Sequence, residues 1–440
     1  MALPRGSGGT GGSPQLNERA RIHFARAEAP RRDLALALLF TLAAAAFRLP
    51  GLGTPAEEVF DEVYHAKTAL QYLNGEPPTE WVHPPTAKLL IAVGVWLFGY
   101  VPWAWRLVPA LAGTALAPVF YLLARRVLST ERAAVLATVL LLCDGVYLVQ
   151  SRIAMTNIFA VLFQVSAALF ILRAALRPRL SAPDMALAGV FLGLALSTRW
   201  TSLWAAGYLG LVLLAVRRLR IVKPRELSLT LLAFVFLPVG IYVLSYVPWM
   251  RQGEGHALSE LLPLQRAIWR YHADLRATHP YFSTWYTWPW LYRPTWYHFK
   301  QTGETIRGIV AIGNPALWWA AVPVTLWALV TGAREQDARR LFSGLGFCFL
   351  YLPWGLAPRT LNYSHYLFEA IPYACLSLGT LLDRGWSGKW GAYARLYVAV
   401  VVALFLFFLP FLVALPVPAS WYFRDLGGGV RPWTWFEKWV

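Results

Sequence analysis

Residues 107–124 read LVPALAGTALAPVFYLLA and are followed directly by Arg125 and Arg126. The run is as long as a membrane-spanning helix, and basic residues directly after such a run are typical of its cytoplasmic end. Apolar runs of this kind recur along the whole chain. They lie near residues 34–50, 107–124, 133–150, 157–173, 184–197, 200–216, 228–249, 313–332, 341–356, 364–382 and 396–415. The sequence therefore predicts an all-α polytopic membrane protein with about 11 transmembrane helices.

The composition agrees with this class. Of the 440 residues, 57% are hydrophobic and 14% are charged, which a soluble domain of this size could not easily shield from water. The cysteines, Cys143, Cys348 and Cys375, all lie in or beside apolar runs. They indicate neither a disulfide framework nor a zinc site. We expect no cofactor, and the sequence leaves the question of a divalent metal ion open.

The positive charge of the chain also fits a membrane protein. Its formal net charge of +17 would by itself be compatible with nucleic-acid binding. However, the basic residues cluster in alternate connections between apolar runs, as the positive-inside rule requires. The clusters lie in residues 1–32, 125–132, 173–179, 217–225, 334–340 and 384–395. We therefore expect membrane lipids and not nucleic acid as partners, with a cytoplasmic N-terminus and an external C-terminus.

The same alternation divides the chain into segments. Residues 1–32 are rich in Gly and Arg and are expected to form a disordered cytoplasmic leader. Residues 33–415 form the transmembrane domain, with large external loops at 54–105 and 250–312. Residues 416–440 are expected to form an external aromatic tail.

The first external loop contains an apolar stretch, Thr86 to Val101, that could be a further span or a helix on the membrane surface. A span there would put the next basic connection on the wrong side, so a surface helix is predicted. Two prolines precede this helix, and Lys88 lies in its first turn. Lys88 can reach a phosphate from there, or its side chain can extend to the lipid headgroups. His83 is expected to hold the Pro-Pro turn.

Two adjacent carboxylates, Asp61 and Glu62, lie just past the first apolar run in the segment FDEVYH of residues 60–65. A general base for a lipid-borne substrate has to lie at such a place, beside the bilayer on the external face. Alternatively, Asp61 caps the helix that follows, since Asp is a favoured N-cap residue. The dipeptide alone does not separate these interpretations.

Four further blocks match one family in the same order along the chain. They are residues 83–90 (HPPTAKLL), 106–113 (RLVPALAG), 144–155 (DGVYLVQSRIAM) and 193–200 (GLALSTRW). With the acidic pair, they resemble the protein O-mannosyltransferases, multi-span enzymes of the type-C glycosyltransferase fold. Two positions depart from the family pattern. Arg199 replaces the usual lysine, and Thr156-Asn157 stands where an aspartate is common, which makes a metal ion less expected.

The resemblance implies the transfer of mannose from a polyprenyl-phosphate carrier to Ser or Thr hydroxyls of exported proteins. The short second loop implies a compact prokaryotic form, active on the external face of a bacterial cell membrane. The reaction needs a base for the acceptor hydroxyl and positive charge for the departing phosphate. Asp61 is then the base of an inverting displacement. Glu62 orients the acceptor or holds the hydrogen bonds of the pair.

The candidates for binding the donor phosphate are Arg106, Arg152, Arg199 and Lys88. For each arginine, pairing with Asp61, Glu62 or Asp144 to hold the loop is an equally good expectation. Support for the loops or for the acceptor is expected from His65, His83, Trp288 and Arg293. The stretch from Trp285 to Pro294 is so rich in aromatic residues that we favour a stacking platform for sugar over interfacial anchoring alone.

Two other functions are compatible with the same features. The lipid-A aminosugar transferases share the fold, the acidic first loop and a lipid-phosphate donor, and differ in the acceptor. A transporter would also have many spans and intramembrane arginines. Transporters usually show internal repeats with broken helices at matching positions, and no such correspondence is found in this sequence.

Overall fold

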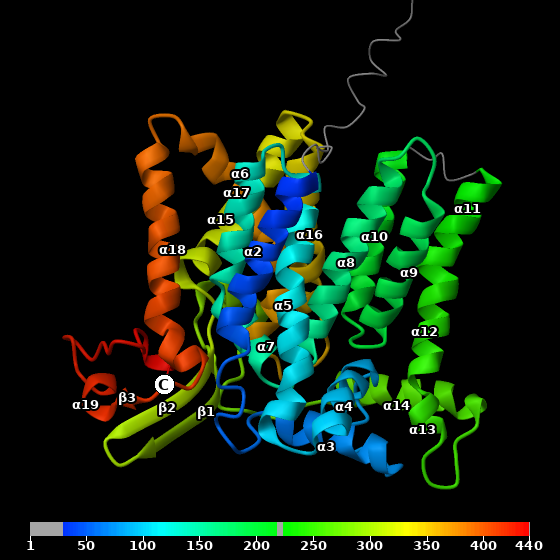
Figure 1. Ribbon diagram of the computed structural model, residues 1–440, viewed down its shortest axis with the longest axis horizontal. Helices are drawn as coiled ribbons and strands as arrows, with labels where there is room; N and C mark the ends of the chain where they lie inside the picture. Colours follow the sequence, from blue (N-terminus) through cyan, green and yellow to red (C-terminus); the bar gives the residue numbers. More distant parts are fainter. Residues whose placement is uncertain (1–29, 218–222, 440) are drawn as a thin grey trace, which may run out of the picture.

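The computed structural model describes residues 30–217 and 223–439 and is mainly helical (Figure 1). The expected leader, residues 1–32, therefore lies almost wholly outside the described residues. The α-helices are α2 (Pro30–Arg48), α3 (Glu62–Asn74), α4 (Thr86–Phe98), α5 (Pro102–Val127), α6 (Glu131–Leu142), α7 (Gly145–Arg152), α8 (Asn157–Ala175), α9 (Ala182–Leu196), α10 (Ser202–Arg217), α11 (Pro224–Leu231), α12 (Leu237–Ser245), α13 (Val247–Met250), α14 (Leu261–Asp274), α15 (Pro315–Arg334), α16 (Ala338–Tyr351), α17 (Ile371–Trp386), α18 (Gly391–Leu412) and α19 (Ala419–Tyr422). Short 3₁₀ segments η4 (Trp285–Trp290), η5 (Leu352–Leu356) and η6 (Ser364–Glu369) connect some of them.

The long helices run side by side, and the short elements gather at one end of the bundle (Figure 1). Each apolar run expected to cross the membrane overlaps a helix. Among the described residues, five helical segments are long and apolar enough to cross a membrane alone. They are Pro102–Val127, Asn157–Ala175, Pro224–Ser245, Pro315–Arg334 and Gly391–Leu412. The predicted fold, a multi-pass helical membrane protein, is confirmed, whereas the predicted number of spans stays a prediction.

One apolar run, residues 133–150, forms a broken helix. The axes of α6 and α7 differ by 59°. The break comes at Asp144, whose carboxylate accepts the backbone N–H of Tyr147 at 2.8 Å and so caps α7. Trp318 also donates its indole N–H to this carboxylate, at 2.6 Å. The break directs the chain after α7 towards the end of the bundle where α3 and α4 lie.

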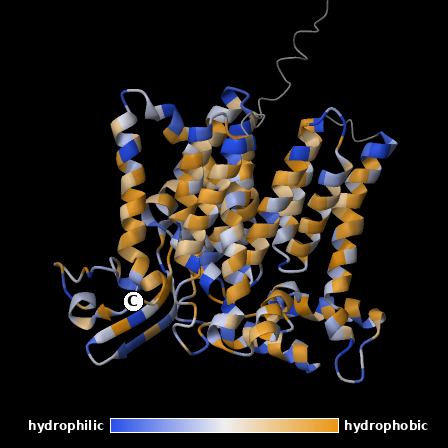
Figure 2. Cartoon of the chain, in the orientation of Figure 1, coloured by the Kyte–Doolittle hydropathy of each residue, from blue (hydrophilic) through white to orange (hydrophobic). Residues whose placement is uncertain are grey.

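The short apolar helix α4 lies at this end with α3 and α14, outside the bundle of long helices (Figure 1). Its last turn exposes Trp96, Leu97 and Phe98. Hydrophobic colour covers the middle of the bundle, and hydrophilic colour gathers near the connections at both ends (Figure 2). This placement of α4 fits a helix that lies along a membrane surface.

A small antiparallel sheet adds to the expected all-α fold. Strands β1 (Thr295–Thr302) and β2 (Thr305–Ala311) form a hairpin in the second large loop, and β3 (Val417–Pro418) pairs with β2. Gly303 has a φ of +57° in the turn, a conformation that glycine adopts without strain. Both strands are rich in aromatic and β-branched residues, which favour extended structure. The sheet brings the aromatic tail against the second loop.

Candidate active site

The acidic pair begins where the chain enters α3. Phe60, the residue before Asp61, has a φ of +50°, which is uncommon for a bulky side chain. Its ring stacks on Tyr297 of β1, with 4.2 Å between the ring centroids. Tyr363 and His365 lie beside the same ring, at centroid distances of 5.6 and 6.1 Å. The second loop and the segment before α17 therefore hold the backbone conformation that sets the position of Asp61.

The carboxylate of Asp61 has no hydrogen-bond partner among residues 30–217 and 223–439. It makes no capping bond to α3, so the alternative interpretation of Asp61 as a helix cap is wrong. Burial raises the pKa of Asp61 above its ordinary value, and the charges of His65, Arg199 and Arg359 partly oppose this rise. Asp61 is thus an unpaired, partly exposed carboxylate in a largely desolvated place.

Glu62 differs completely from its neighbour. Its side chain is fully buried and forms a two-pronged ion pair with Arg106, at 2.8 Å from Nε and 2.6 Å from Nη2. The backbone N–H groups of Val59 and Ala154 also donate to it, at 3.0 and 2.9 Å. These four contacts leave little room for an acceptor. The geometry favours the second of the two roles expected for Glu62, that of holding hydrogen bonds.

Arg106 uses all of its donors within the protein. Besides Glu62, it donates to the backbone carbonyls of Leu52, Pro55 and Glu57, at 2.9, 2.6 and 3.0 Å. Its side chain is 1% exposed. A guanidinium has five N–H groups, and each of them has a partner here. The geometry therefore favours loop bracing over phosphate binding for Arg106.

Lys88 is also fully committed to the loop. It is buried, and its Nζ forms an ion pair with Glu80 and donates to the carbonyls of Glu80 and His83, at 3.0 and 2.8 Å. An ammonium has three donors, so none is left for a phosphate. A buried Nζ also does not extend to the headgroups. The observed contacts replace both expectations for Lys88 with a third role, which is to hold the turn of residues 80–83.

His83 lies at the centre of this turn. Its Nδ1 lies 2.7 Å from Oε1 of Glu80, and its ring packs against His272 of α14 at a centroid distance of 5.1 Å. Burial lowers the pKa of His83 to about 3, although the Glu80 carboxylate opposes this effect. His83 is therefore neutral at pH 7, and it links the turn to α14.

His272 connects this turn to Arg359, a residue that the sequence analysis did not single out. Its Nε2 lies 2.8 Å from the carbonyl of Val82, and its Nδ1 lies 3.3 Å from Nη1 of Arg359. Since an arginine can only donate, His272 is neutral with its proton on Nε2. Arg359 also donates to the carbonyl of Leu361 at 2.8 Å. In the described part of the chain, no carboxylate lies within ion-pair distance of Arg359.

Arg199 lies near the same cluster. Its Nη1 donates to the side chain of Asn157, and its Nε lies 3.5 Å from Oε1 of Glu369. Its guanidinium also lies over the ring of Tyr366, at 5.0 Å from the centroid. No hydrogen bond from Nη2 of Arg199 occurs within the described ranges. Asn157 thus orients this arginine.

Arg152 has a different role. Its Nη1 donates to the carbonyls of Phe47, Arg48 and Pro50, at 3.0, 2.9 and 2.8 Å. These carbonyls belong to the last turn of α2 and the residues after it, where cations and donors satisfy free carbonyl groups. The geometry thus favours helix capping over phosphate binding for Arg152.

The four expected support residues lie in structural contacts. The ring of His65 bonds through Nδ1 to the carbonyl of Ala154, at 2.8 Å, one turn after Asp61. Trp288 is fully buried and packs against Trp354 and Tyr366, so it cannot act as an open sugar platform. Arg293 donates to the carbonyls of Pro280 and Phe282. In the same stretch, Tyr286, Trp290 and Tyr292 are exposed.

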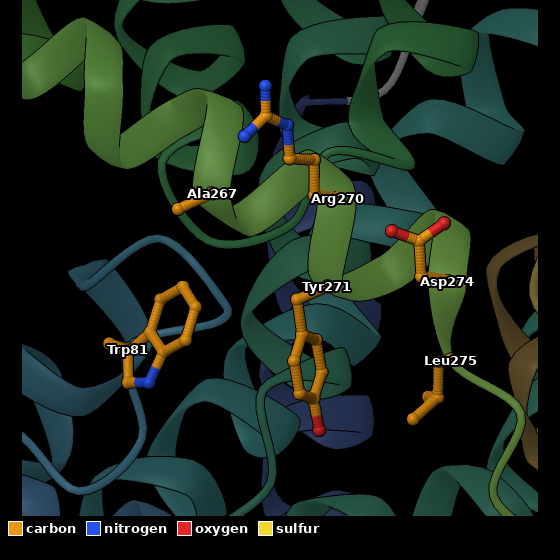
Figure 3. A pocket seen from close by; sticks show the side chains of 6 residues that line it. All are labelled: Trp81, Ala267, Arg270, Tyr271, Asp274 and Leu275. Carbon is orange, nitrogen blue, oxygen red and sulfur yellow. The ribbon is translucent and has the colours of Figure 1, made fainter.

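A cavity of about 510 Å³ lies beside this cluster, between the turn around Trp81 and one face of α14 (Figure 3). The rings of Trp81 and Tyr271 line it in an edge-to-face arrangement, with centroids 5.9 Å apart, and Arg270 and Asp274 lie on its α14 side (Figure 3). Asp61 does not line this cavity, so we do not assign it to the reaction.

Among residues 30–217 and 223–439, no group of three or more His, Cys, Asp or Glu side chains is arranged to hold a metal ion. The charges of Arg199 and Arg359 act on Asp61, and the terminal nitrogens of both arginines have no acidic partner within the described ranges. Such groups suit an anion.

Sequence comparison decides the family. The family described as dolichyl-phosphate-mannose-protein mannosyltransferase matches residues 38–105 and 101–253, and the C-terminal four-span region of protein O-mannosyltransferase matches residues 257–425. The chain belongs to the protein O-mannosyltransferase family. A polyprenol-phosphate-mannose–protein mannosyltransferase of Mycolicibacterium smegmatis is 28% identical over 87% of this chain and 90% of its own length.

Solved structures agree with this fold. The protein O-mannosyltransferase complex Pmt1-Pmt2 of S. cerevisiae, bound to the sugar donor, has a TM-score of 0.78 at 14% identity, over 92% of this chain and 93% of that one. ArnT from Cupriavidus metallidurans, bound to undecaprenyl phosphate, has a TM-score of 0.55 at 18% identity, over 86% of this chain and 70% of that one. The protein O-mannosyltransferase fold predicted from the four sequence blocks is thus confirmed.

Proposed function

We propose that this chain is an inverting glycosyltransferase that moves mannose from a polyprenyl-phosphate carrier to Ser or Thr hydroxyls of proteins, with Asp61 as the base. The observation that carries the proposal is the unpaired carboxylate of Asp61 beside two arginines with free donors. The relatives named as polyprenol-phosphate-mannose–protein mannosyltransferases support the choice of donor and acceptor.

The proposed reaction needs one proton transfer and one displacement. Asp61 takes the proton of the acceptor hydroxyl as its oxygen bonds to the anomeric carbon. The acceptor oxygen attacks from the face opposite the phosphate. The bond between the anomeric carbon and the phosphate oxygen breaks, and the phosphate leaves with the electron pair. A raised pKa makes Asp61 a stronger base than an ordinary aspartate.

We assign the departing phosphate to Arg359 and Arg199. Both have terminal nitrogens without acidic partners at hydrogen-bond distance in the described ranges, and both act on the pKa of Asp61. A planar guanidinium suits a phosphate because it can donate two parallel hydrogen bonds. Arg199 was expected from the sequence in this role, and Arg359 is a new candidate. Arg106, Arg152 and Lys88 then hold the surrounding loops.

We place the site on the external face of a bacterial cell membrane, with the N-terminus cytoplasmic. The connections at the end of the bundle opposite α3 contain the basic clusters around Arg125, Arg177, Arg334 and Arg384, which the positive-inside rule assigns to the cytoplasm. The Asp61 end contains the aromatic loops and the surface helix α4. A polyprenyl-phosphate sugar presented at the outer headgroups would meet Asp61 there.

The decisive experiment compares Asp61→Asn with Glu76→Gln in a reconstituted assay with polyprenyl-phosphate mannose and a Ser/Thr-containing peptide. We expect Asp61→Asn to lose about 100- to 10,000-fold in turnover and to keep donor binding. The exposed Glu76→Gln control should keep both. Near-normal turnover of Asp61→Asn would show that Asp61 is not the base.

The same assay tests the acceptor. Mass spectrometry of the product should show a hexose added to the peptide. Sugar added only to a lipid or polysaccharide acceptor would indicate the aminosugar-transferase type of reaction. Donor that is moved across the membrane without being cleaved would indicate a transporter.

A further inference from the structure

A second cavity lies at the other end of the bundle, far from Asp61. It is a groove of about 750 Å³ between α15, α17 and α18. Small residues, among them Ala320, Gly385 and Ala394, open the space, and Trp327, Trp390 and Tyr397 form part of its walls. It runs towards the end of α17 and the start of α18, which lie at the end of the bundle opposite α3 (Figure 1). Almost the whole lining is apolar, so water solvates the groove poorly.

The mouth of this groove is cationic. Arg384 lines it, and Lys389 lies over the ring of Trp390, with Nζ 5.6 Å from the ring centroid. Arg384 has Glu335 at 3.7 Å, whereas Lys389 has no acidic partner in the part of the chain that the structure describes. The mouth therefore carries an excess of positive charge.

We propose that one anionic phospholipid of the surrounding bilayer occupies this groove. Its acyl chain lies against the apolar walls, and its phosphate lies at Arg384 and Lys389. Basic pockets between transmembrane helices at the cytoplasmic side suit anionic headgroups. Trp390 and Tyr393 are half exposed or more, and such amphipathic rings favour the depth at which headgroups meet acyl chains.

The charge at the mouth argues against other occupants. A second copy related by a two-fold axis would place the same cationic mouths against each other. The chain's own leader, residues 1–29, has four arginines and two glutamates, so it too would bring net positive charge to a positive mouth. The polyprenyl-phosphate donor is assigned to the opposite end of the bundle.

The test is native mass spectrometry of the purified full-length chain after exchange into phosphatidylglycerol or phosphatidylcholine. We expect one retained phosphatidylglycerol per chain and about tenfold weaker retention of phosphatidylcholine. The double variant R384E/K389E should lose this preference, because its mouth becomes negative. Ala394→Trp fills the groove and should lose retention of both lipids.

The matched control is R179E/K223E, which reverses two exposed basic residues at the same end of the bundle but away from the groove. It should keep the preference for phosphatidylglycerol. Circular dichroism and elution volume establish that each variant is folded, and R384E/K389E decides the question if Ala394→Trp does not fold. An unchanged preference in R384E/K389E would overturn the proposal. Unchanged lipid retention in folded Ala394→Trp would also overturn it. The same holds if the unchanged protein is a lipid-free dimer that Ala394→Trp disrupts.

Discussion

Two carboxylates that are adjacent in the sequence lie in opposite environments. Glu62 is buried and has four hydrogen-bond contacts, two of them from Arg106. Asp61 has none among the described residues, although Arg199 and Arg359 both act on its pKa. Glu62 and Arg106 form a closed cluster that holds the loop. Asp61, Arg199 and Arg359 form an open cluster that can receive a substrate. The paired carboxylate thus fixes the position of the unpaired one.

The largest effect on this comparison should come from Arg106→Ala. The change leaves Glu62 charged and buried without a cation, and it leaves the carbonyls of Leu52, Pro55 and Glu57 without their donor. Breaking a buried ion pair from one side costs about 3–5 kcal/mol of the free energy of unfolding. We expect a much lower midpoint of thermal unfolding in detergent, together with loss of activity.

The control for this effect is Asp61→Asn, which should inactivate the enzyme and leave the unfolding midpoint near that of the unchanged protein. If Arg106→Ala unfolds at the normal temperature and loses only donor binding, Arg106 binds the phosphate, and the closed cluster is misassigned.

The sequence predicts the fold well because its signals are local. The length of an apolar run and the arginines beside it indicate a span without any knowledge of distant contacts. The strands β1 and β2 were missed because a hairpin of this length gives no signal comparable to that of a membrane span. The acidic pair was also found from its neighbours in sequence.

The roles within the site depend on contacts that a single sequence does not reveal. Arg106 is 44 residues from Glu62, and Ala154 is 92 residues from it. Arg359 is a lone arginine after an apolar run, and its link to His272 joins positions 87 residues apart. Trp288 is buried while Trp290, two positions later, is half exposed, because a 3₁₀ turn and not a strand separates them.

The next effect in size should come from Arg359→Ala, which removes a donor from the open cluster. A hydrogen bond to a charged group contributes about 1.5–3 kcal/mol, so the affinity for polyprenyl-phosphate mannose should fall about 10- to 100-fold. Arg359→Lys should restore part of this affinity, because lysine keeps the charge without the planar pair of donors. Direct binding of the labelled donor measures the effect.

A matched control for Arg359 is Arg293→Ala. Arg293 also donates to backbone carbonyls of the second loop, but it is not among the charges with the largest effect on the pKa of Asp61. It should leave donor affinity unchanged. Equal donor affinity in Arg359→Ala and the unchanged protein would mean that the open cluster does not receive the phosphate there.

The smallest effect is on pH dependence, which should differ between stability, through His83, and activity, through Asp61. Burial lowers the pKa of His83 to about 3, so this histidine is neutral when folded and takes up a proton on unfolding below about pH 6.5. Its contribution to stability is therefore full above about pH 6.5 and is lost as the pH falls, by up to about 2 kcal/mol at pH 5. Activity should also fall at low pH, but through protonation of Asp61, whose pKa burial raises. His83→Gln should flatten the dependence of the unfolding midpoint on pH and leave the pH at which activity is half-lost unchanged, with the half-buried His256→Gln as the control. A midpoint that keeps its full pH dependence in His83→Gln would show that another group carries the proton uptake.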